Sequence, residues 1–369
     1  MNTCPSLAFS ILLLIFSCGQ PKDKAPDELR LKQFGQRLDS LRQQRGIPGL
    51  SVAVAYGDSV VYAAGFGYAD IEDGIPAMAN TPYWIASITK PVAATAIMQL
   101  VEEGKVDLDW KMKDFHPDWE GTCARILAYF REAEPEYAFL LDNYHPERDD
   151  ITLLHHLTHT AEGLPGERYK YNGFLYGRVS RAVEEGTGLP FDSLVNARII
   201  RPLGMAHSAH SLSDSSRMEV IQALAKPYKL DEKGNPVRTD YPDPKLNAGA
   251  GMVASATDIL LFDRAYFGGE LVDDTTRTGM LRPTTLNDGS SSPYGIGWFV
   301  QLHAGDTLLW HYGHQPDGYS GIYLRIPQRK LSVVMLANSD ALTAREDLGK
   351  GDITVSPFVQ ALLESTRRR

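Results

Sequence analysis

Strand-forming sequence lies at both ends of this chain, with helix-forming sequence between. Near the amino end, residues 49–56 and 59–65 are rich in apolar and β-branched residues and are separated by Gly57-Asp58, which predicts a hairpin with a tight turn. Similar runs return late, at residues 295–302, 307–312, 321–326 and 331–337. A single sheet then takes strands from both ends of the chain, and the middle is expected to form an inserted lobe.

Helical patterns fill the middle and flank the strands. One is expected over residues 87–103, stopping at Gly104, another over 175–185, and a last amphipathic helix over 355–363. The expected fold class is α/β (α+β), an antiparallel sheet flanked by helices with an inserted, mainly helical lobe. The expected boundaries are about 29–105 and 241–369 for the sheet lobe, and about 106–240 for the helical lobe.

The composition excludes several classes of protein. With 369 residues, 43% hydrophobic content and 22% charged content, the chain can bury a substantial core and is not intrinsically disordered. A formal net charge of −9 argues against a nucleic-acid partner, which normally meets a basic face. The three cysteines are too few for a disulfide scaffold. No internal apolar run approaches the ~18 residues that span a bilayer, so a polytopic membrane protein is not expected.

The amino terminus is expected to be a targeting segment. Residues 7–16 are almost wholly apolar, a length typical of a signal-peptide core, and Ile15-Phe16-Ser17-Cys18 resembles a bacterial lipobox. We expect a signal peptide over 1–17, lipidation of Cys18, a polar tether over 18–28, and an exported, lipid-anchored protein of the periplasm or cell envelope. The alternative is an ordinary cleaved signal with an incidental cysteine. Removal of Cys4 and lipidation of Cys18 would leave Cys123 without a disulfide partner.

Ser87 and Lys90 are the first candidates for chemistry. A spacing of three residues puts both side chains on one face of a helix, within reach of each other. The helix that follows is apolar on nearly every turn, which predicts burial. A buried lysine tends to lose its proton, and a neutral amine beside a serine serves as a general base. Such a pair occurs about once by chance in a chain of this composition, and the alternative is a solvated surface pair.

The surrounding motifs decide between these two interpretations. IASITK at 85–90, ITLLHHLTHTAEGL at 151–164, RPLGM at 201–205, AGAGMVASATD at 248–258 and YGIGW at 294–298 occur in the same order as in a known superfamily. The chain resembles the serine β-lactamase and penicillin-binding-protein superfamily, in its class C-like branch. This resemblance implies a serine nucleophile that forms an acyl-enzyme, and neither a metal nor a cofactor.

The resemblance implies a Tyr-x-Asn motif on a loop of the helical lobe. Its tyrosine is assigned to Tyr171, because Tyr176 and Gly188 follow at the family's spacing. A nearby lysine ammonium is expected to lower the pKa of the phenol, which would then relay protons. Gly173 stands where the family usually has asparagine, and Asn172 is the candidate substitute in the substrate pocket. The alternative for Tyr171 is a packed loop tyrosine.

The third motif implied by the resemblance is His-x-Gly at His311, where Gly313 lets substrate lie along the strand edge. The resemblance also places the oxyanion hole at the backbone N–H groups of Ser87 and His314. Imidazole is mostly neutral near pH 7, so this site attracts a substrate carboxylate less than a lysine would. That favours esters or uncharged amides over β-lactam antibiotics. If His311 is only a strand histidine, His314 is the next catalytic candidate.

Two further features need interpretation. His155, His156 and His159 include a pair spaced as on one helix face, which is a possible zinc site, but no carboxylate follows the first histidine. The resemblance makes His159 structural, so no metal site is expected. Residues 119–150 are longer than the family's usual linker, and the stretch from His159 to Tyr171 is short. We expect an open cleft with a lid formed by residues 119–150.

The predicted function is a secreted serine hydrolase. Ser87, Lys90, Tyr171 and His311 are the catalytic candidates, and the expected substrates are esters or short or D-amino-acid amides. One alternative is a β-lactamase that hydrolyses antibiotics. Another is a non-catalytic cell-envelope binding protein with a degenerate fold, which the glycine at position 173 favours. The expected partners are a small-molecule or peptide acyl substrate and, through a lipid anchor only, the membrane.

Overall fold

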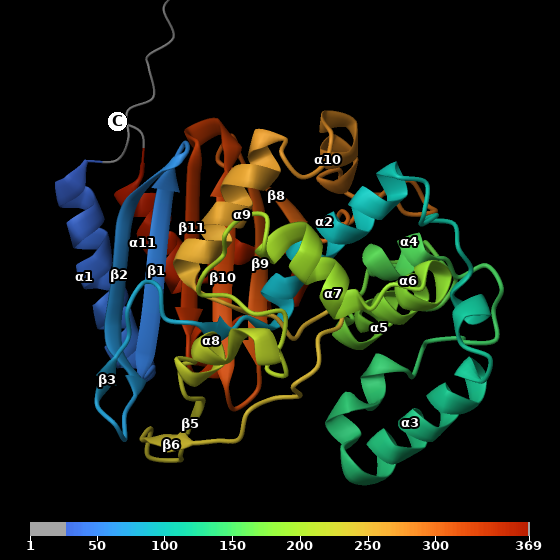
Figure 1. Ribbon diagram of the computed structural model, residues 1–369, viewed down its shortest axis with the longest axis horizontal. Helices are drawn as coiled ribbons and strands as arrows, with labels where there is room; N and C mark the ends of the chain where they lie inside the picture. Colours follow the sequence, from blue (N-terminus) through green and yellow to red (C-terminus); the bar gives the residue numbers. More distant parts are fainter. Residues whose placement is uncertain (1–26, 368–369) are drawn as a thin grey trace, which may run out of the picture.

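The computed structural model describes residues 27–367 (Figure 1). The predicted signal peptide, the predicted lipidation site at Cys18 and almost all of the tether predicted for residues 18–28 lie outside these residues.

A seven-stranded antiparallel sheet has the strand order β3-β2-β1-β11-β10-β9-β8. The strands are β1 (Gly49–Tyr56), β2 (Ser59–Asp70), β3 (Ile75–Pro76), β8 (Phe299–His303), β9 (Asp306–Gln315), β10 (Tyr319–Ile326) and β11 (Leu331–Ala337). The central pairing joins β1 to β11, with Leu50 opposite Ala337. The prediction of one antiparallel sheet made from both ends of the chain is therefore confirmed.

Helices cover both faces of this sheet (Figure 1). On one face α1 (Glu28–Arg45) packs against α11 (Pro357–Ser365), and Phe34 of α1 contacts Tyr62 of β2. On the other face lies α9 (Ala256–Gly268), whose buried Asp263 accepts hydrogen bonds of 2.8 Å from the Tyr323 hydroxyl and 2.7 Å from Arg325. A buried carboxylate needs such partners, and here they fix α9 to the strands.

The remaining elements lie mainly in the middle of the chain. The helices are α2 (Thr89–Glu102), α3 (Trp119–Ala133), α4 (Leu153–Leu157), α5 (Gly173–Gly177), α6 (Val179–Thr187), α7 (Phe191–Val195), α8 (Met218–Gln222) and α10 (Asp274–Met280). Two small sheets pair β4 (Tyr83–Trp84) with β7 (Val253–Ala254), and β5 (Tyr228–Leu230) with β6 (Pro236–Arg238). Figure 1 shows α3 to α7 gathered on the side of the molecule away from α1.

Several elements differ from the sequence-based expectation. The helix α1 was not predicted, and it begins within the expected tether because Asp27 caps the N–H of Arg30. The helix expected over 175–185 is divided into α5 and α6, where the Ser180 hydroxyl bonds the carbonyl of Gly177 and competes with the helical ladder. The strand expected from 295 begins only at Phe299, because the chain turns at Gly297 with a φ of +80°.

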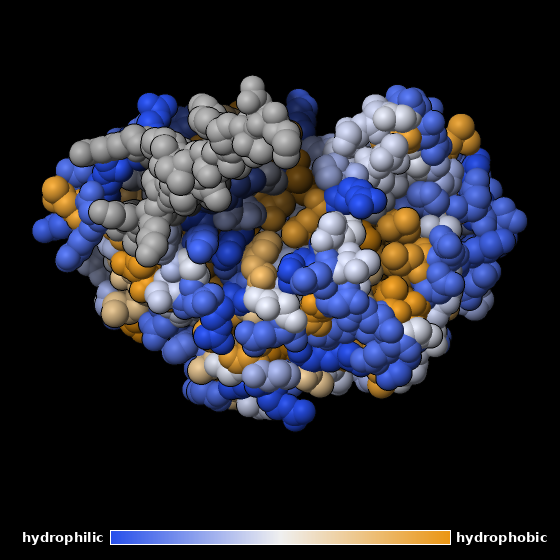
Figure 2. Space-filling model, turned by 90° about the horizontal axis from the view of Figure 1, so that it is seen from above, coloured by the Kyte–Doolittle hydropathy of each residue, from blue (hydrophilic) through white to orange (hydrophobic). Residues whose placement is uncertain are grey.

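Among residues 27–367, no helix is both long enough and apolar enough to cross a bilayer. Figure 2 shows a face that is mostly hydrophilic, on which apolar residues form separate groups.

Candidate active site

Ser87 lies in a 3₁₀ turn, Ala86–Ile88, that leads directly into α2. Ala86, the residue before it, has a φ of +48°, which is in the left-handed region that costs a residue with a side chain about 1–2 kcal/mol. The turn packs against β9 so closely that a Cβ at Gly313 would lie 2.4 Å from the carbonyl oxygen of Ile85. Glycine at position 313 therefore allows the catalytic strand to approach the serine.

Lys90 lies in the first turn of α2 and is completely buried. Its Nζ is 2.7 Å from Ser87 Oγ, the contact that the three-residue spacing predicted. Burial lowers the pKa of Lys90 to about 7. Much of the amine is therefore uncharged at neutral pH, and an uncharged amine can accept the proton of the serine hydroxyl.

The second partner of Lys90 is a backbone carbonyl far away in the sequence. Lys90 Nζ donates a hydrogen bond of 2.9 Å to the oxygen of Gly249. The Asn247 side chain holds this loop by accepting from the N–H groups of Gly249 and Ala250. The sequence did not predict this contact, because Lys90 and Gly249 are 159 positions apart.

Tyr171 packs against the same amine, with Lys90 Nζ 5.1 Å from the centre of its ring. Its hydroxyl is buried, and the polar group beside it is the Ser87 side chain. Burial raises the pKa of Tyr171 well above its usual value, Tyr312 adds to this rise, and the Ser87 side chain opposes it. The expectation that a lysine ammonium lowers this pKa is therefore wrong. Tyr171 therefore stays a protonated phenol at neutral pH.

An aromatic cluster holds Tyr171 in place. His159 stacks on it with ring centres 4.4 Å apart, and Phe299 stacks on it at 5.7 Å. The Nδ1 atom of His159 accepts a hydrogen bond from the N–H of Asn172. His159 thus has the structural role that the resemblance implied.

His311 lies on β9 with its ring centre 6.1 Å from that of Tyr171. Its Nδ1 donates to the carbonyl of Tyr312 at 2.7 Å, and its Nε2 accepts from the Tyr294 hydroxyl at 2.9 Å. Burial, with a contribution from Lys90, lowers the pKa of His311 well below its usual value. The imidazole is therefore neutral, as expected, and both of its nitrogens are bonded to neighbours within the fold.

The residues predicted for the oxyanion hole lie on adjacent elements. Ser87 belongs to the 3₁₀ turn and His314 to β9, which pack against each other. The ring of His314 is partnered by Thr343, whose hydroxyl also donates to the carbonyl of Gly313. The ring of His314 is thus bonded to Thr343. The assignment of the backbone N–H groups of Ser87 and His314 to the oxyanion hole stays a prediction.

Position 173 faces the Lys90 amine, whereas the side chain of Asn172 is bonded to other parts of the fold. A Cβ at position 173 would lie 3.8 Å from Lys90 Nζ, so a side chain there would face the amine. The Asn172 side chain is used elsewhere: Oδ1 caps Leu175, and Nδ2 donates to Leu140 and Glu162. The suggestion that Asn172 replaces the missing asparagine is therefore wrong, because all its polar atoms serve the fold.

The three histidines do not form a metal site. His155 accepts from the N–H of Thr152, His156 bonds Tyr144 and the carbonyl of Leu175, and His159 bonds Asn172. Between residues 27 and 367, no cluster of three or more His, Cys, Asp or Glu side chains could hold a metal ion.

The long segment 119–150 reaches the loop that carries Tyr171. It consists of α3 and a 3₁₀ stretch, Pro135–Leu140, whose carbonyls at Phe139 and Leu140 accept from Lys170 and Asn172. The segment therefore borders the candidate site through the Tyr171 loop. That it acts as a lid stays a prediction.

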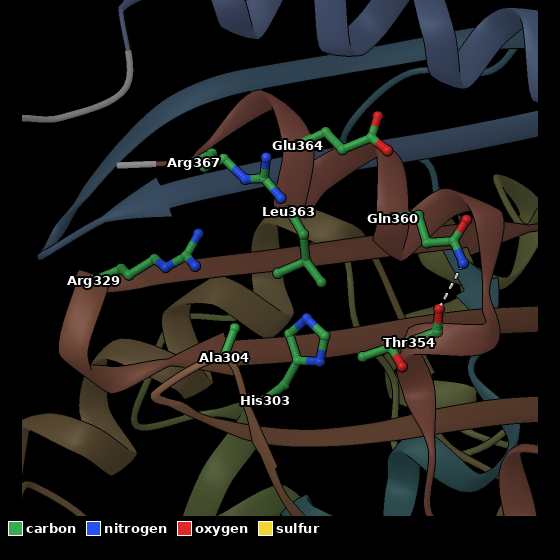
Figure 3. A pocket seen from close by; sticks show the side chains of 8 residues that line it. All are labelled: His303, Ala304, Arg329, Thr354, Gln360, Leu363, Glu364 and Arg367. Carbon is green, nitrogen blue, oxygen red and sulfur yellow. Dashed lines mark hydrogen bonds between the residues drawn. The ribbon is translucent and has the colours of Figure 1, made fainter. Parts of the chain in front are cut away.

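A separate pocket lies between the turn after β8, a 3₁₀ turn at Pro327–Arg329, and α11 (Figure 3). Arg329 lines this pocket but is paired with Asp306 at 2.6 Å, and Gln360 bonds the carbonyl of Thr354. No residue that lines it belongs to the Ser87 site.

Comparison with known proteins agrees with this arrangement. The family model described as "Beta-lactamase" matches residues 34–353. Penicillin-binding protein 4* of Bacillus subtilis is 24% identical over 315 residues, which cover 80% of this chain and 69% of that protein.

Two solved structures show the same fold. The octameric penicillin-binding protein homologue from Pyrococcus abyssi superposes with a TM-score of 0.70 at 23% identity, covering 90% of this chain and 77% of the other. The D-amino acid amidase from Ochrobactrum anthropi has a TM-score of 0.65 at 22% identity, covering 91% and 98%. The expected fold class is confirmed.

The lowered pKa of Lys90 leads to a prediction for pH dependence. The rate at which a fluorophosphonate labels Ser87 should rise about tenfold per pH unit below pH 7 and level off above it, because only the uncharged amine accepts the serine proton. Labelling rates measured from pH 5 to 9 test this. Lys90→Met should abolish labelling, and Lys105→Met, at an exposed lysine, should not. A flat profile in the wild type would contradict the role of Lys90.

The space beside Gly173 leads to a second prediction. Gly173→Asn should fold normally, and its amide oxygen should accept a hydrogen bond from Lys90, which stabilises the ammonium form and raises the pKa of Lys90. The midpoint of the labelling profile should therefore move to higher pH, by about one unit. Gly173→Ala adds a Cβ without an acceptor and should leave the midpoint in place. An unchanged midpoint in Gly173→Asn, with an unchanged Tm, would show that a side chain at position 173 does not form a hydrogen bond with Lys90.

Proposed function

Because this chain belongs to the beta-lactamase family and is a serine hydrolase, we propose that it cleaves esters and short or D-amino-acid amides through an acyl-enzyme on Ser87. The observation that carries this proposal is the 2.7 Å contact between Ser87 Oγ and a fully buried Lys90 amine. Serine is a weak nucleophile until a neighbouring base takes its proton. The buried amine, with its pKa lowered to about 7, supplies that base.

In the proposed reaction, Lys90 takes the Ser87 proton as Oγ bonds to the substrate carbonyl carbon. The carbonyl oxygen becomes an oxyanion, stabilised by the backbone N–H groups of Ser87 and His314. The protonated phenol of Tyr171 then gives its proton to the leaving alcohol or amine, and Lys90 returns a proton to Tyr171. Water hydrolyses the acyl-enzyme by the same steps in reverse, releasing an acid and restoring Ser87.

The neutrality of His311 supports the choice of substrate. Its two nitrogens are held by Tyr312 and Tyr294, and the pKa of the ring is lowered well below its usual range. A neutral ring on β9 gives no charge to attract the carboxylate that β-lactam antibiotics carry. The likeness to a D-amino acid amidase supports the inclusion of amides.

A β-lactamase activity is the second candidate, supported by the family match and by the likeness to penicillin-binding protein 4*. A non-catalytic binding protein is the third, supported by the missing side chain at Gly173. The three candidates differ in whether Ser87 becomes acylated and by which acyl donor.

Replacement of the nucleophile tests the proposal. Ser87→Ala should lower p-nitrophenyl acetate hydrolysis by about 10³-fold or more, because the attacking atom is gone. The wild type should have a higher kcat/KM for p-nitrophenyl esters than for nitrocefin, measured by absorbance at pH 8. Ser40→Ala, on α1, is the matched control. Greater efficiency on nitrocefin would favour the β-lactamase, and the absence of acylation by either substrate would favour the binding protein.

We also propose that the protein is exported and anchored through a lipid on Cys18. The support is the apolar run at residues 7–16 followed by Ile15-Phe16-Ser17-Cys18. In a bacterial host, the wild type should incorporate labelled palmitate and sediment with membranes, and Cys18→Ala should do neither. Cys123→Ala should behave as the wild type, because that cysteine is buried in the fold. A wild-type protein without label would contradict the proposed anchor.

A further inference from the structure

A buried carboxylate lies outside the proposed reacting groups and beside the Tyr171 loop. Glu162 is only 2% exposed. Its Oε2 is 2.7 Å from Lys170 Nζ, and its Oε1 accepts from Asn172 Nδ2 at 2.7 Å. These two partners are the residues immediately before and after Tyr171. One carboxylate therefore holds both neighbours of the proposed proton donor.

The backbone N–H groups of these two neighbours are both bonded to His159. The N–H of Lys170 donates to the carbonyl of His159 at 2.9 Å, and the N–H of Asn172 donates to its Nδ1 at 3.1 Å. The ring of His159 also stacks on Tyr171. The loop on both sides of Tyr171 is thus held by Glu162 and His159, and the ring itself packs between His159 and Phe299.

The same two donors extend from Glu162 to the inserted segment. Lys170 Nζ donates to the carbonyl of Phe139 at 2.9 Å, and Asn172 Nδ2 donates to that of Leu140 at 2.8 Å. Both carbonyls belong to the 3₁₀ stretch Pro135–Leu140, named here the 135–140 tip. The same two donors therefore connect Glu162 and the 135–140 tip to the residues on either side of Tyr171.

Glu162 is a buried carboxylate with partners for both of its oxygens. A buried carboxylate is costly unless it is paired and hydrogen-bonded, and here both oxygens have partners. Glu162 is therefore held in a specific set of contacts.

We propose that Glu162 is a positioning residue that fixes the hydroxyl of Tyr171 and couples the 135–140 tip to it. This rests on the proposed function, in which Tyr171 gives a proton to the leaving group. Misplacement of a reacting group by about 1 Å can cost about 100-fold in rate. Loss of the carboxylate should therefore slow turnover more than it weakens substrate binding.

The test compares Glu162→Ala and Glu162→Gln with the wild type and with Glu167→Gln, a change at an exposed residue of the same loop. Gln keeps one oxygen acceptor, so it should rescue part of the function. The kcat for D-alanine p-nitroanilide, whose anilide nitrogen must be protonated to leave, is measured per Ser87 titrated with a fluorophosphonate, which corrects for unfolded protein. Hydrogen exchange of residues 135–140 and 169–173 is followed by mass spectrometry, and this readout needs no activity.

We expect kcat per titrated site to fall about 10- to 100-fold in Glu162→Ala and less in Glu162→Gln, with KM changed less than about twofold. The midpoint of the pH profile should stay at about 7, since Lys90 keeps its partners. Exchange should rise in both segments together. Glu167→Gln should match the wild type in every measurement.

Two outcomes would overturn the proposal. One is a kcat per titrated site in Glu162→Ala within twofold of the wild type. The other is faster exchange in only one of the two segments, which would show that they are not coupled. A wild type that is never labelled at Ser87 would instead contradict the proposed function, and the exchange data would then decide the coupling alone.

Discussion

Burial of one amine is the constraint on which the candidate site depends. Lys90 has no exposed surface, and its polar contacts are Ser87 Oγ and the carbonyl of Gly249, with the rings of Tyr171 and Tyr176 about 5 Å away. A charged ammonium in such a place is costly, so the pKa of the lysine falls to about 7. The surrounding packing thus makes a base from a residue that is normally cationic, and it can do so only while water is kept out.

Much of the fold and part of the site could be predicted from the sequence, where the relevant interactions are local or follow a known spacing. Alternating and β-branched runs predicted the long strands of the sheet. The three-residue spacing of Ser87 and Lys90 predicted that their side chains touch. Family spacing also led to Tyr171, which packs against Lys90. The chemical roles of these residues stay predictions until they are tested.

The features that sequence reasoning missed depend on partners far apart in the chain. Asn172 is one residue from the family position, but its side chain is taken by Leu140 and Glu162. His311 is a catalytic candidate by its motif, and the sequence did not show that Tyr294 occupies its Nε2. The pKa of Tyr171 was expected to respond to a nearby charge, and burial has the larger effect. Local patterns carry no information on such long-range contacts.

The close approach of Gly313 to Ile85 has a consequence for which residues position 313 can hold. The backbone of β9 and the turn that carries Ser87 touch without an intervening side chain, so they cannot slide or separate without breaking the packing between them. Any side chain larger than a hydrogen at position 313 would therefore push β9 away from Ile85 and displace the turn that carries Ser87. This single glycine thus sets the distance between the nucleophile and the neighbouring strand.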